Sequence, residues 1–305
     1  MTTPTSQPYS LGIDGGGSKT LAIIVDAQGN QQGQGLSGSS NYAAVGMDQA
    51  IAHIYGAVEA AIQEAGCTLP LHAAWLGLAG IDRQDDCEKL LPHLRSLAER
   101  VHLTNDGELL LSALNGAVGI ALIAGTGSIA LVRNAQGNIK RAGGWGHILG
   151  DEGSGYDIGR HALQAATRAA DGRGPHTMLL DLISQHWHLN SADGLIDKVY
   201  HDEDKASIAQ LSTLVFMAAR SKDSMARTIV EQAAHELALA AITASAILNH
   251  RSEPLPIALG GGLLLHETDF REQVLEAIGK HRPVGQVELV TQPALSAARA
   301  AINLT

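Results

Sequence analysis

A pattern of strand, glycine-rich turn and strand occurs twice in this chain, about one domain apart. In the first copy, Tyr9–Asp14 reads as a short strand, Gly15–Ser18 as the turn, and Thr20–Asp26 as a β-branched return strand. In the second copy, the apolar strand Gly119–Ala124 leads into the turn Gly125–Ser128 and another return strand. Glycines in tight turns between apolar strands predict a β-hairpin at each place.

Each copy closes on the same four residues, Ala-Gln-Gly-Asn, at 27–30 and at 135–138. Solenoid repeats have short periods, whereas this period approaches the length of a domain. A chain of 305 residues is long enough for two domains. We therefore predict an α/β protein with two similarly built domains, residues 1–117 and residues 118–305.

Helical spacing of apolar residues predicts helices in both halves, and more of them in the second. They cover Met47–Ala65, Gln84–Arg100, Glu108–Leu114, Ser154–Ala170, Thr177–His188, Ala206–Arg220, Met225–His250, Phe270–Gly279 and Ala294–Leu304.

Charge and cysteine content narrow the partners and the compartment. A net charge of −10 argues against nucleic acid or an anionic membrane surface as a partner. The two cysteines, Cys67 and Cys87, indicate a reducing cytoplasm and exclude a disulfide framework or a cysteine-built zinc site. Residues 1–8 lack the features of a signal peptide and predict a disordered tail. We expect a cytoplasmic protein that does not cross a membrane.

The first glycine-rich turn is close to a P-loop but departs from it. Ser18 adds one residue before Lys19, and the turn leads into a strand where a P-loop opens a helix. The interpretation that survives is a hairpin whose backbone N–H groups face a phosphate. Asp14, at the end of the first strand, would then hold Mg²⁺ through water. The alternative is a hairpin whose glycines only satisfy a positive φ.

The second turn, Gly125–Ser128, repeats this chemistry in the second half. A single glycine-rich hairpin is weak evidence for phosphate binding. Two such turns at equivalent places can hold a polyphosphate from two sides. The pair therefore favours a nucleotide over a purely structural explanation.

Asp106 lies in the sequence Asn-Asp-Gly at the carboxyl end of a predicted strand. Acids at strand ends line the crevice of open α/β sheets, where catalysis takes place. An aspartate before a helix can also simply cap that helix. The residues alone leave both interpretations open.

The segment Gly143–Gly155 contains six glycines interrupted by Trp145, His147, Asp151 and Glu152. Such a polar, glycine-rich loop between apolar elements usually binds a ligand. For His147 and Trp145 we predict structural roles, Trp145 being packed. One of the two acids can serve as a cap for the following helix.

Three glycines, Gly260, Gly261 and Gly262, follow a predicted strand. They would let the backbone lie flat against a planar ligand such as adenine. A plain tight turn is the competing explanation.

These motifs, in this order, resemble the ATP-binding folds of actin, hexokinase and the heat-shock chaperones, over nearly the whole chain from Ile13 onward. Within that superfamily the chain is similar to the BadF/BadG/BcrA/BcrD ATPase family, which holds N-acetylglucosamine kinases and activator ATPases of acyl-CoA enzymes. The segment G-G-W-G-H-I-L-G-D-E-G-S at 143–154 is close to that of the kinases, and Ser39-Ser40-Asn41 resembles their sugar-binding loop.

The resemblance implies a role for each matching position. Asp106 corresponds to the catalytic base, and the turns Asp14–Thr20 and Gly125–Ser128 correspond to the two phosphate-binding hairpins. The positions implied for ATP are Gly15, Gly16, Gly17, Ser18, Lys19, Thr20, Thr126, Gly127, Ser128, Gly260, Gly261 and Gly262. The positions implied for the sugar are Asn41, Asp106, Gly127, Gly144 and Asp151.

The implied fold is two ribonuclease-H-like domains with mixed five-stranded sheets around an ATP-binding cleft, the last helix, 294–305, packing back on the first domain. The implied reaction is ATP- and Mg²⁺-dependent phosphorylation of an amino sugar, foremost N-acetylglucosamine to its 6-phosphate. The alternatives are a glucosamine kinase and an activator ATPase, whose iron–sulfur cluster needs suitably placed cysteines. The preferred sugar, the hydroxyl, the role of residues 164–249 and the oligomeric state stay open, with a homodimer as one candidate.

Overall fold

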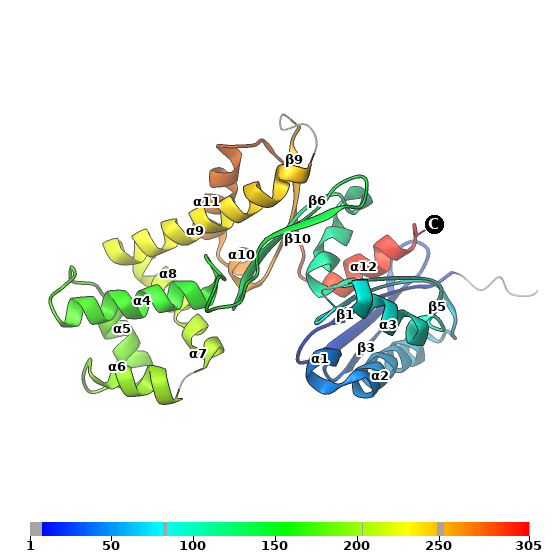
Figure 1. Cartoon of the computed structure of the whole chain (residues 1–305), viewed down its shortest axis with the longest axis horizontal. Helices are drawn as coiled ribbons and strands as arrows, with labels where there is room; N and C mark the ends of the chain where they lie inside the picture. The colour runs from blue at the N-terminus through cyan, green and yellow to red at the C-terminus, as the bar shows by residue number, and fades with distance from the viewer. Residues whose placement is uncertain (1–7, 82–83, 203, 249–252, 305) are drawn as a thin grey trace, which may run out of the picture. The chain divides into compact units, whose positions relative to one another are not determined.

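The computed structural model describes residues 8–81, 84–202, 204–248 and 253–304 (Figure 1). The described residues form two compact units. The first unit runs to Ala117 and takes up the chain again from Val290, and the second runs from Val118 to Leu289. Nearly all of the predicted N-terminal tail, and the predicted helix end at His250, lie outside the described residues.

The first unit contains a five-stranded mixed sheet in the order β3-β2-β1-β4-β5. The first three strands pair antiparallel, while β4 pairs parallel with both β1 and β5. The strands and the two helices that cover them are β1 (Ser10–Gly15), β2 (Thr20–Val25), β3 (Gln31–Ser37), β4 (Leu71–Leu78), β5 (Ala98–Asn105), α2 (Met47–Ala65) and α12 (Pro293–Ala301).

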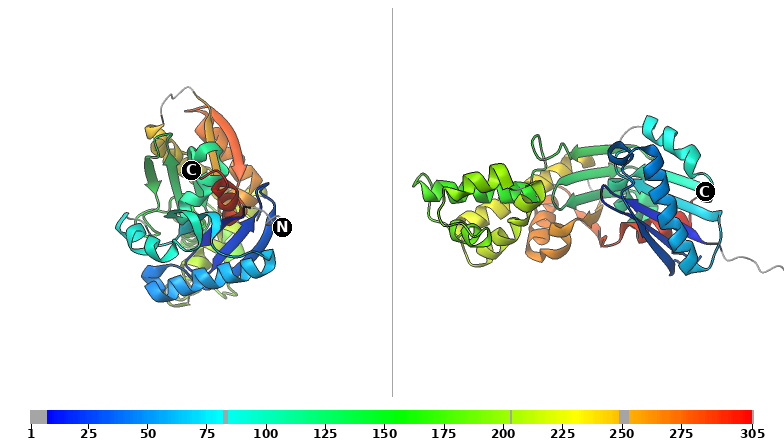
Figure 2. Two further views of the ribbon diagram at one scale, coloured as in Figure 1. Left: turned by 90° about the vertical axis from the view of Figure 1, so that its right-hand side faces the viewer. Right: turned by 90° about the horizontal axis from the view of Figure 1, so that it is seen from below.

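The helices α2 and α12 cover opposite faces of this sheet (Figure 2). Successive side chains of a strand point to opposite faces. In β2, Ala22 and Ile24 join the core under α2, while Ile23 and Val25 pack against α12. Gly12 in β1 permits the close approach of α12, because a Cβ there would lie 1.9 Å from a backbone oxygen of that helix.

The second unit repeats the same strand plan, in the order β8-β7-β6-β9-β10. Three antiparallel strands are again followed by two parallel ones, since β9 pairs parallel with β6 and β10 pairs parallel with β9. The strands are β6 (Gly119–Ala124), β7 (Ser128–Arg133), β8 (Ile139–Gly143), β9 (Leu255–Gly260) and β10 (Val284–Leu289). The predicted fold class, α/β with a mixed five-stranded sheet in each half, is confirmed.

The two Ala-Gln-Gly-Asn turns have the same construction. The residue before each turn, Asp26 or Asn134, accepts hydrogen bonds through Oδ1 from the backbone N–H groups two and four residues further on. Gly29 and Gly137 have φ values of +79° and +81°, where glycine is favoured because it lacks a Cβ. Equal turns in equal places support duplication of one structural unit.

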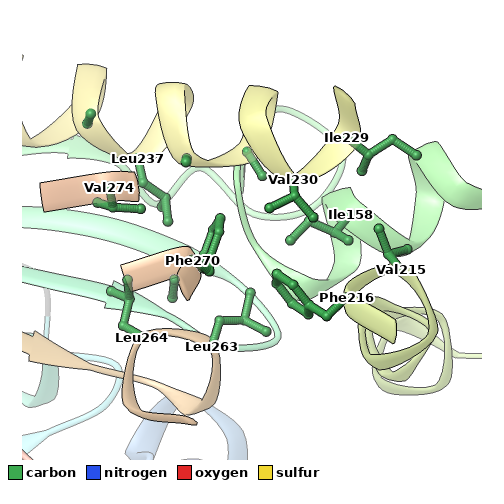
Figure 3. Close-up of a cluster of buried hydrophobic side chains, with 14 of the residues drawn as sticks. Ile158, Val215, Phe216, Ile229, Val230, Leu237, Leu263, Leu264, Phe270 and Val274 are labelled. Atoms are coloured by element: carbon green, nitrogen blue, oxygen red, sulfur yellow. The ribbon is translucent and has the colours of Figure 1, made fainter. Parts of the chain in front are cut away.

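Most of the second unit outside the sheet is helical. Its α-helices are α4 (Gly155–Ala170), α5 (Leu179–His186), α6 (Gly194–Asp197), α7 (Lys205–Gln210), α8 (Ser212–Arg220), α9 (Ser224–Ala244), α10 (Gly262–His266) and α11 (Thr268–Gly279). Figure 3 shows the apolar side chains that join these helices, with Phe216 and Phe270 in edge contact at 5.3 Å between ring centroids. None of the helices in the described part of the chain has the length and apolarity that a bilayer span requires.

Three predicted helices are wrong in extent, one of them the helix over Met225–His250, which ends as an α-helix at Ala244. The helix predicted over Gln84–Arg100 is shorter in the structure, where α3 covers only Gln84–Leu94. Ala98 and Arg100 belong instead to the start of β5 and pair with β4. Local periodicity does not reveal this pairing, which depends on a distant strand. The helix predicted over Ala206–Arg220 is broken into α7 and α8 at Leu211, a fully buried residue.

Several short elements were not predicted from the sequence. They are α1 (Tyr42–Val45), α6, the 3₁₀ helix η2 (Asn115–Ala117) and the π-helical η3 (Lys198–Asp202). Within the helix predicted over Met225–His250, α9 ends at Ala244 and the 3₁₀ helix η4 (Ser245–Ile247) follows it. The helix predicted over Glu108–Leu114 is instead the 3₁₀ helix η1 (Asp106–Ala113). Such one- or two-turn elements are stabilised by their surroundings, since short helices are marginal by themselves.

Candidate functional site

The hairpin between β1 and β2 contains glycines, Gly16 and Gly17, at positions where the fold does not require glycine. Gly16 donates its N–H to the Lys19 carbonyl at 2.9 Å, which closes the turn. Gly16 and Gly17 do not have the positive φ that favours glycine. A Cβ at Gly16 would meet nothing closer than 3.5 Å, and one at Gly17 nothing within 4 Å. The positive-φ explanation of these glycines is therefore wrong, and the space beside their backbone is open.

Asp14 is the second-last residue of β1, directly before this hairpin, and is partly shielded from water. Burial, with the negative charge of Asp106 as a second cause, raises the pKa of Asp14 from 3.8 to about 6, while Lys19 acts in the opposite direction. Two carboxylates that disfavour each other's charge favour a bound cation between them or beside them. Among the described residues, no group of three or more His, Cys, Asp or Glu side chains forms a metal cage. This donor set fits Mg²⁺, which takes one or two carboxylates and completes its shell with water and phosphate.

Asp106 follows β5 and opens η1. The helix cap is the neighbouring Asn105, whose Oδ1 accepts the Gly107 N–H at 2.9 Å. Asp106 Oδ1 also lies 2.9 Å from that N–H, which orients its carboxyl group. Because Asn105 already caps the helix, capping alone does not explain an acid at position 106.

The loop that contains Asn41 is hydrogen bonded to the hairpin. The Ser39 hydroxyl donates to the Gly16 carbonyl at 3.2 Å, and the Asn41 N–H donates to Ser39 Oγ at 3.2 Å. Asn41 caps α1 by accepting the Ala43 N–H through Oδ1. The side-chain NH₂ of Asn41, which the cap does not use, is a group that it can offer to a sugar hydroxyl beside this hairpin.

In the second unit, the hairpin between β6 and β7 is fastened to the start of α4. Gly155 donates its N–H to the Gly125 carbonyl at 2.8 Å, and the Ser128 hydroxyl donates to the Glu152 carbonyl at 2.7 Å. Gly125, like Gly16, lacks a positive φ, and a Cβ placed on it would meet no atom closer than 3.7 Å. This turn is a second stretch of accessible backbone on a rigid support.

The Gly143–Gly155 loop holds its acids and its aromatic residues differently from the prediction. Ser154 caps α4, so neither Asp151 nor Glu152 does. Trp145, predicted to be packed, is 63% exposed, with the Arg141 guanidinium 4.7 Å from its ring centre. His147 contacts the Tyr156 ring edge-on, which agrees with a structural role.

Asp151 is buried beside the second hairpin. A Cβ at Gly127 would lie 3.0 to 3.1 Å from the two Asp151 carboxylate oxygens, and the Ser128 N–H is 3.4 Å from Oδ1. Lys205 pairs with Oδ2 at 2.8 Å. Gly144, the other predicted sugar contact of the loop, has a φ of +70° and lies against the Ile129 side chain.

The glycine run 260–262 lies on the other side of the same hairpin. Gly261 has a φ of +83°, and a Cβ there would be 2.3 Å from the Ala124 carbonyl oxygen, so the fold itself requires glycine. Gly262 begins α10, and its N–H is 3.7 Å from the Cβ position of Gly125. Hairpin and glycine run thus form one continuous surface.

A cavity of about 390 Å³ adjoins this surface, which is within the range of small-ligand sites. Residues that line it include Gly125, Thr126, Thr213, Phe216, Gly262 and His266. An aromatic ring, a hydroxyl and exposed backbone suit a planar base with polar edges. The sequence did not mark four residues that lie beside this cavity or the Asp151 carboxylate, because they belong to helices without a motif: Lys205, Thr213, Phe216 and His266.

The structure thus gathers the predicted positions in two groups. Asp14, the first hairpin, Asn41 and Asp106 belong to the first unit, while the second hairpin, Gly144, Asp151 and the glycine run belong to the second. The first group can bind phosphate and a metal and accept a proton, and the second can bind phosphate, hydroxyls and a base.

Comparison with known proteins finds relatives that match nearly the whole chain. The sequence is 34% identical over 261 residues to an N-acetylmuramic acid/N-acetylglucosamine kinase of Clostridium acetobutylicum, covering 84% of this chain and 85% of that protein. It is 30% identical over 319 residues to an N-acetyl-D-glucosamine kinase of Dictyostelium discoideum, covering 98% and 99%.

A solved structure extends the likeness to three dimensions. A protein from Chromobacterium violaceum, provisionally assigned as an N-acetylglucosamine kinase, superposes with a TM-score of 0.72 at 27% identity over 97% of this chain and 99% of that one. The family model described as the BadF/BadG/BcrA/BcrD ATPase family matches residues 11–298. The chain belongs to the BadF/BadG/BcrA/BcrD ATPase family.

Proposed function

We propose that this protein is an ATP-dependent sugar kinase that converts N-acetylglucosamine to N-acetylglucosamine 6-phosphate. The observation that carries the proposal is the chain-long similarity to two kinases named for N-acetylglucosamine, together with an acid at a strand end whose capping role a neighbour already fills. Phosphoryl transfer needs positioning, charge stabilisation and a proton acceptor rather than covalent help from the protein.

In the proposed reaction, Asp106 takes the proton of the sugar hydroxyl as that oxygen attacks the γ-phosphorus of ATP. The new bond joins the sugar oxygen to phosphorus, the bond to the β,γ-bridging oxygen breaks, and ADP leaves. The hydrogen bond that Asp106 accepts from the Gly107 N–H would limit rotation of the carboxyl group during this transfer.

Asp14 would hold Mg²⁺ through water, and the ion would supply positive charge to the phosphate oxygens. The contribution of the chain itself is the pair of acids: burial and Asp106 raise the pKa of Asp14, so the free protein disfavours its charge. The backbone N–H at the exposed Gly17 would bind phosphate oxygens without a side chain in the way, while the Gly16 N–H closes the turn.

For the second unit we propose nucleotide and sugar contacts. The hairpin at Gly125 and the cavity beside Gly262 would hold phosphate and adenine, since exposed backbone and the Phe216 ring border the same space. Asp151 would accept hydrogen bonds from sugar hydroxyls, and Gly127 and Gly144 would let the sugar approach the backbone.

A coupled assay of ADP release tests the function. N-acetylglucosamine, glucosamine, N-acetylmannosamine, N-acetylmuramic acid and glucose are compared with a reaction lacking sugar, and ³¹P NMR identifies the phosphorylated oxygen. We expect N-acetylglucosamine to give the largest kcat/KM. If no amino sugar raises turnover above the sugar-free rate, the proposal is wrong.

The activator ATPases offer the main alternative, and the cysteines do not favour it. Cys67 and Cys87 pack against the apolar core of the first unit. Burial raises the pKa of each thiol, which disfavours the thiolate that an iron–sulfur cluster requires. Visible absorption by anaerobically purified protein would support the alternative.

We also propose that the enzyme acts in the cytoplasm as a homodimer. Both cysteines are free thiols, in keeping with a reducing compartment. Light scattering on the purified protein would measure its mass in solution, and a monomer would contradict the assembly state without affecting the proposed reaction.

A further inference from the structure

One ion pair joins the long helical region to the glycine-rich loop. Lys205, the first residue of α7, places Nζ 2.8 Å from Asp151 Oδ2. The Asp151 side chain is 5% exposed, whereas that of Lys205 is 34% exposed. The two residues are 54 positions apart, and no motif marks Lys205. Through this pair, the helical region directly contacts Asp151, a residue proposed to bind the sugar.

Structural stabilisation alone does not explain this arrangement well. A buried ion pair is weak evidence for stability, because apolar residues of similar volume often do as well. Asp151 also has a φ of +59°, a region that residues with a side chain seldom adopt. Strained backbone and a buried charge at one position are features that cluster at functional sites.

The contacts of the carboxylate are unequal. Oδ2 receives the ammonium group of Lys205, while the nearest donor to Oδ1 is the Ser128 N–H at the long distance of 3.4 Å. A carboxylate oxygen can accept more than one hydrogen bond. Oδ1 therefore keeps acceptor capacity, and the contact at Oδ2 restricts rotation of the group.

We propose that Lys205 is a positioning residue of the sugar site, which holds Asp151 so that Oδ1 accepts hydrogen bonds from substrate hydroxyls. This inference rests on the proposed function, in which Asp151 binds the sugar. The helix α7 also contributes Ala206, Ala209 and Gln210 to the wall of the candidate nucleotide cavity. One short helix thus contacts both the sugar-binding acid and the nucleotide cavity.

A double-mutant cycle tests this role. Lys205→Met, Asp151→Asn and the double variant are compared with wild type for the KM and kcat of N-acetylglucosamine and of ATP, and for direct sugar binding by calorimetry. Lys280→Met is the matched control, since it removes an exposed lysine–glutamate pair at the end of α11. Asp151→Asn and the double variant bury no charge at position 151, so both keep the test meaningful if Lys205→Met folds poorly.

We expect Lys205→Met to raise the KM and Kd for the sugar by about 10- to 100-fold, the usual range for a hydrogen bond to a charged group. The KM for ATP should stay near wild type, as should both constants in Lys280→Met. In the Asp151→Asn background, Lys205→Met should have no further effect on sugar affinity, because it acts through Asp151.

Three results would overturn the inference. A rise in the KM for ATP in place of the sugar would make Lys205 a phosphate contact. A lower melting temperature with unchanged sugar affinity would make the pair structural, and additive losses in the double variant would make Lys205 independent of Asp151. Absence of amino-sugar turnover by the wild-type enzyme would instead refute the proposed function itself.

Discussion

Replacing Asp14 by asparagine should stabilise the free protein while abolishing its activity. The fold raises the pKa of Asp14 from 3.8 to about 6, mainly through burial. An acid with a raised pKa binds its proton more tightly when folded, so stability falls as pH rises from the unfolded to the folded pKa and stays reduced above it. At 1.36 kcal/mol per pKa unit, the loss at neutral pH is about 3 kcal/mol.

The assay is urea denaturation of both proteins across pH, without nucleotide or Mg²⁺. The amide that replaces the carboxyl group in Asp14→Asn carries no charge, so the gain over wild type should be largest, up to about 3 kcal/mol, at pH 7. The gain should shrink to roughly one third of that by pH 4.5, where the native Asp14 is already protonated. Turnover of the variant should fall sharply, since the proposed Mg²⁺ contact is lost.

Asp26, which follows β2, is the matched control with the opposite sign. The backbone N–H of Asn30 holds the pKa of Asp26 below its ordinary value, with further hydrogen bonds from Gln28 and Gln32. Its contribution to stability is present above the unfolded pKa and is lost as pH falls. Asp26→Asn should therefore not stabilise the protein at pH 7. A neutral or destabilising Asp14→Asn, or a gain that does not depend on pH, would refute this reasoning.

Three further predictions concern the site. Asp106→Asn should lower kcat by roughly 10²–10⁴ with unchanged sugar affinity. Asn105→Ala should instead cost about 1 kcal/mol of stability, as loss of a helix cap does. Denaturation and steady-state kinetics separate the two effects, and a kcat of Asp106→Asn equal to that of wild type would remove Asp106 from the chemistry. Gly17→Ala should weaken ATP binding with little change in stability. The control Gly137→Ala, at a φ of +81°, should destabilise the protein by about 1 kcal/mol and leave the Kd for ATP unchanged. Calorimetry that found wild-type ATP affinity in both variants would contradict this prediction. Gly127→Ala should raise the KM for the sugar, because its Cβ would come within about 3.0 Å of a carboxylate, and an unaffected KM would show that this carboxylate does not bind sugar.

The strands and turns are the part of the fold that local sequence predicts well. Both Ala-Gln-Gly-Asn turns depend on a glycine with positive φ, and the hairpin strands on apolar and β-branched runs, so the signal of each is contained in the segment that forms it. The duplicated order of these segments then predicts two sheets of one plan. Boundaries failed where a partner far along the chain competes, as at Ala98, which pairs with Leu71 in β4.

The candidate site shows the same division. Asp14, Asp106 and the glycine runs can be found from the sequence, because a strand end or a tight turn marks each of them. Whether Asp106 caps a helix was undecided until the structure assigned that role to Asn105. Phe216 and Thr213 have no local mark, since a helical residue that lines a cavity has the same spacing as one that packs in a core.

By itself, then, the sequence determined the strand plan, the two glycine-rich hairpins and the acids beside them, since short-range φ preferences and alternation of apolar residues control these features. Only the tertiary structure decided that Lys205 pairs with Asp151, which strand residues α12 covers, and which glycines the fold itself requires. Those outcomes depend on side chains that meet across 54 residues or across almost the whole chain, as Arg299 does when it donates to the Gly29 carbonyl. Contacts of that range are set by packing of complete elements, for which no short segment contains the information.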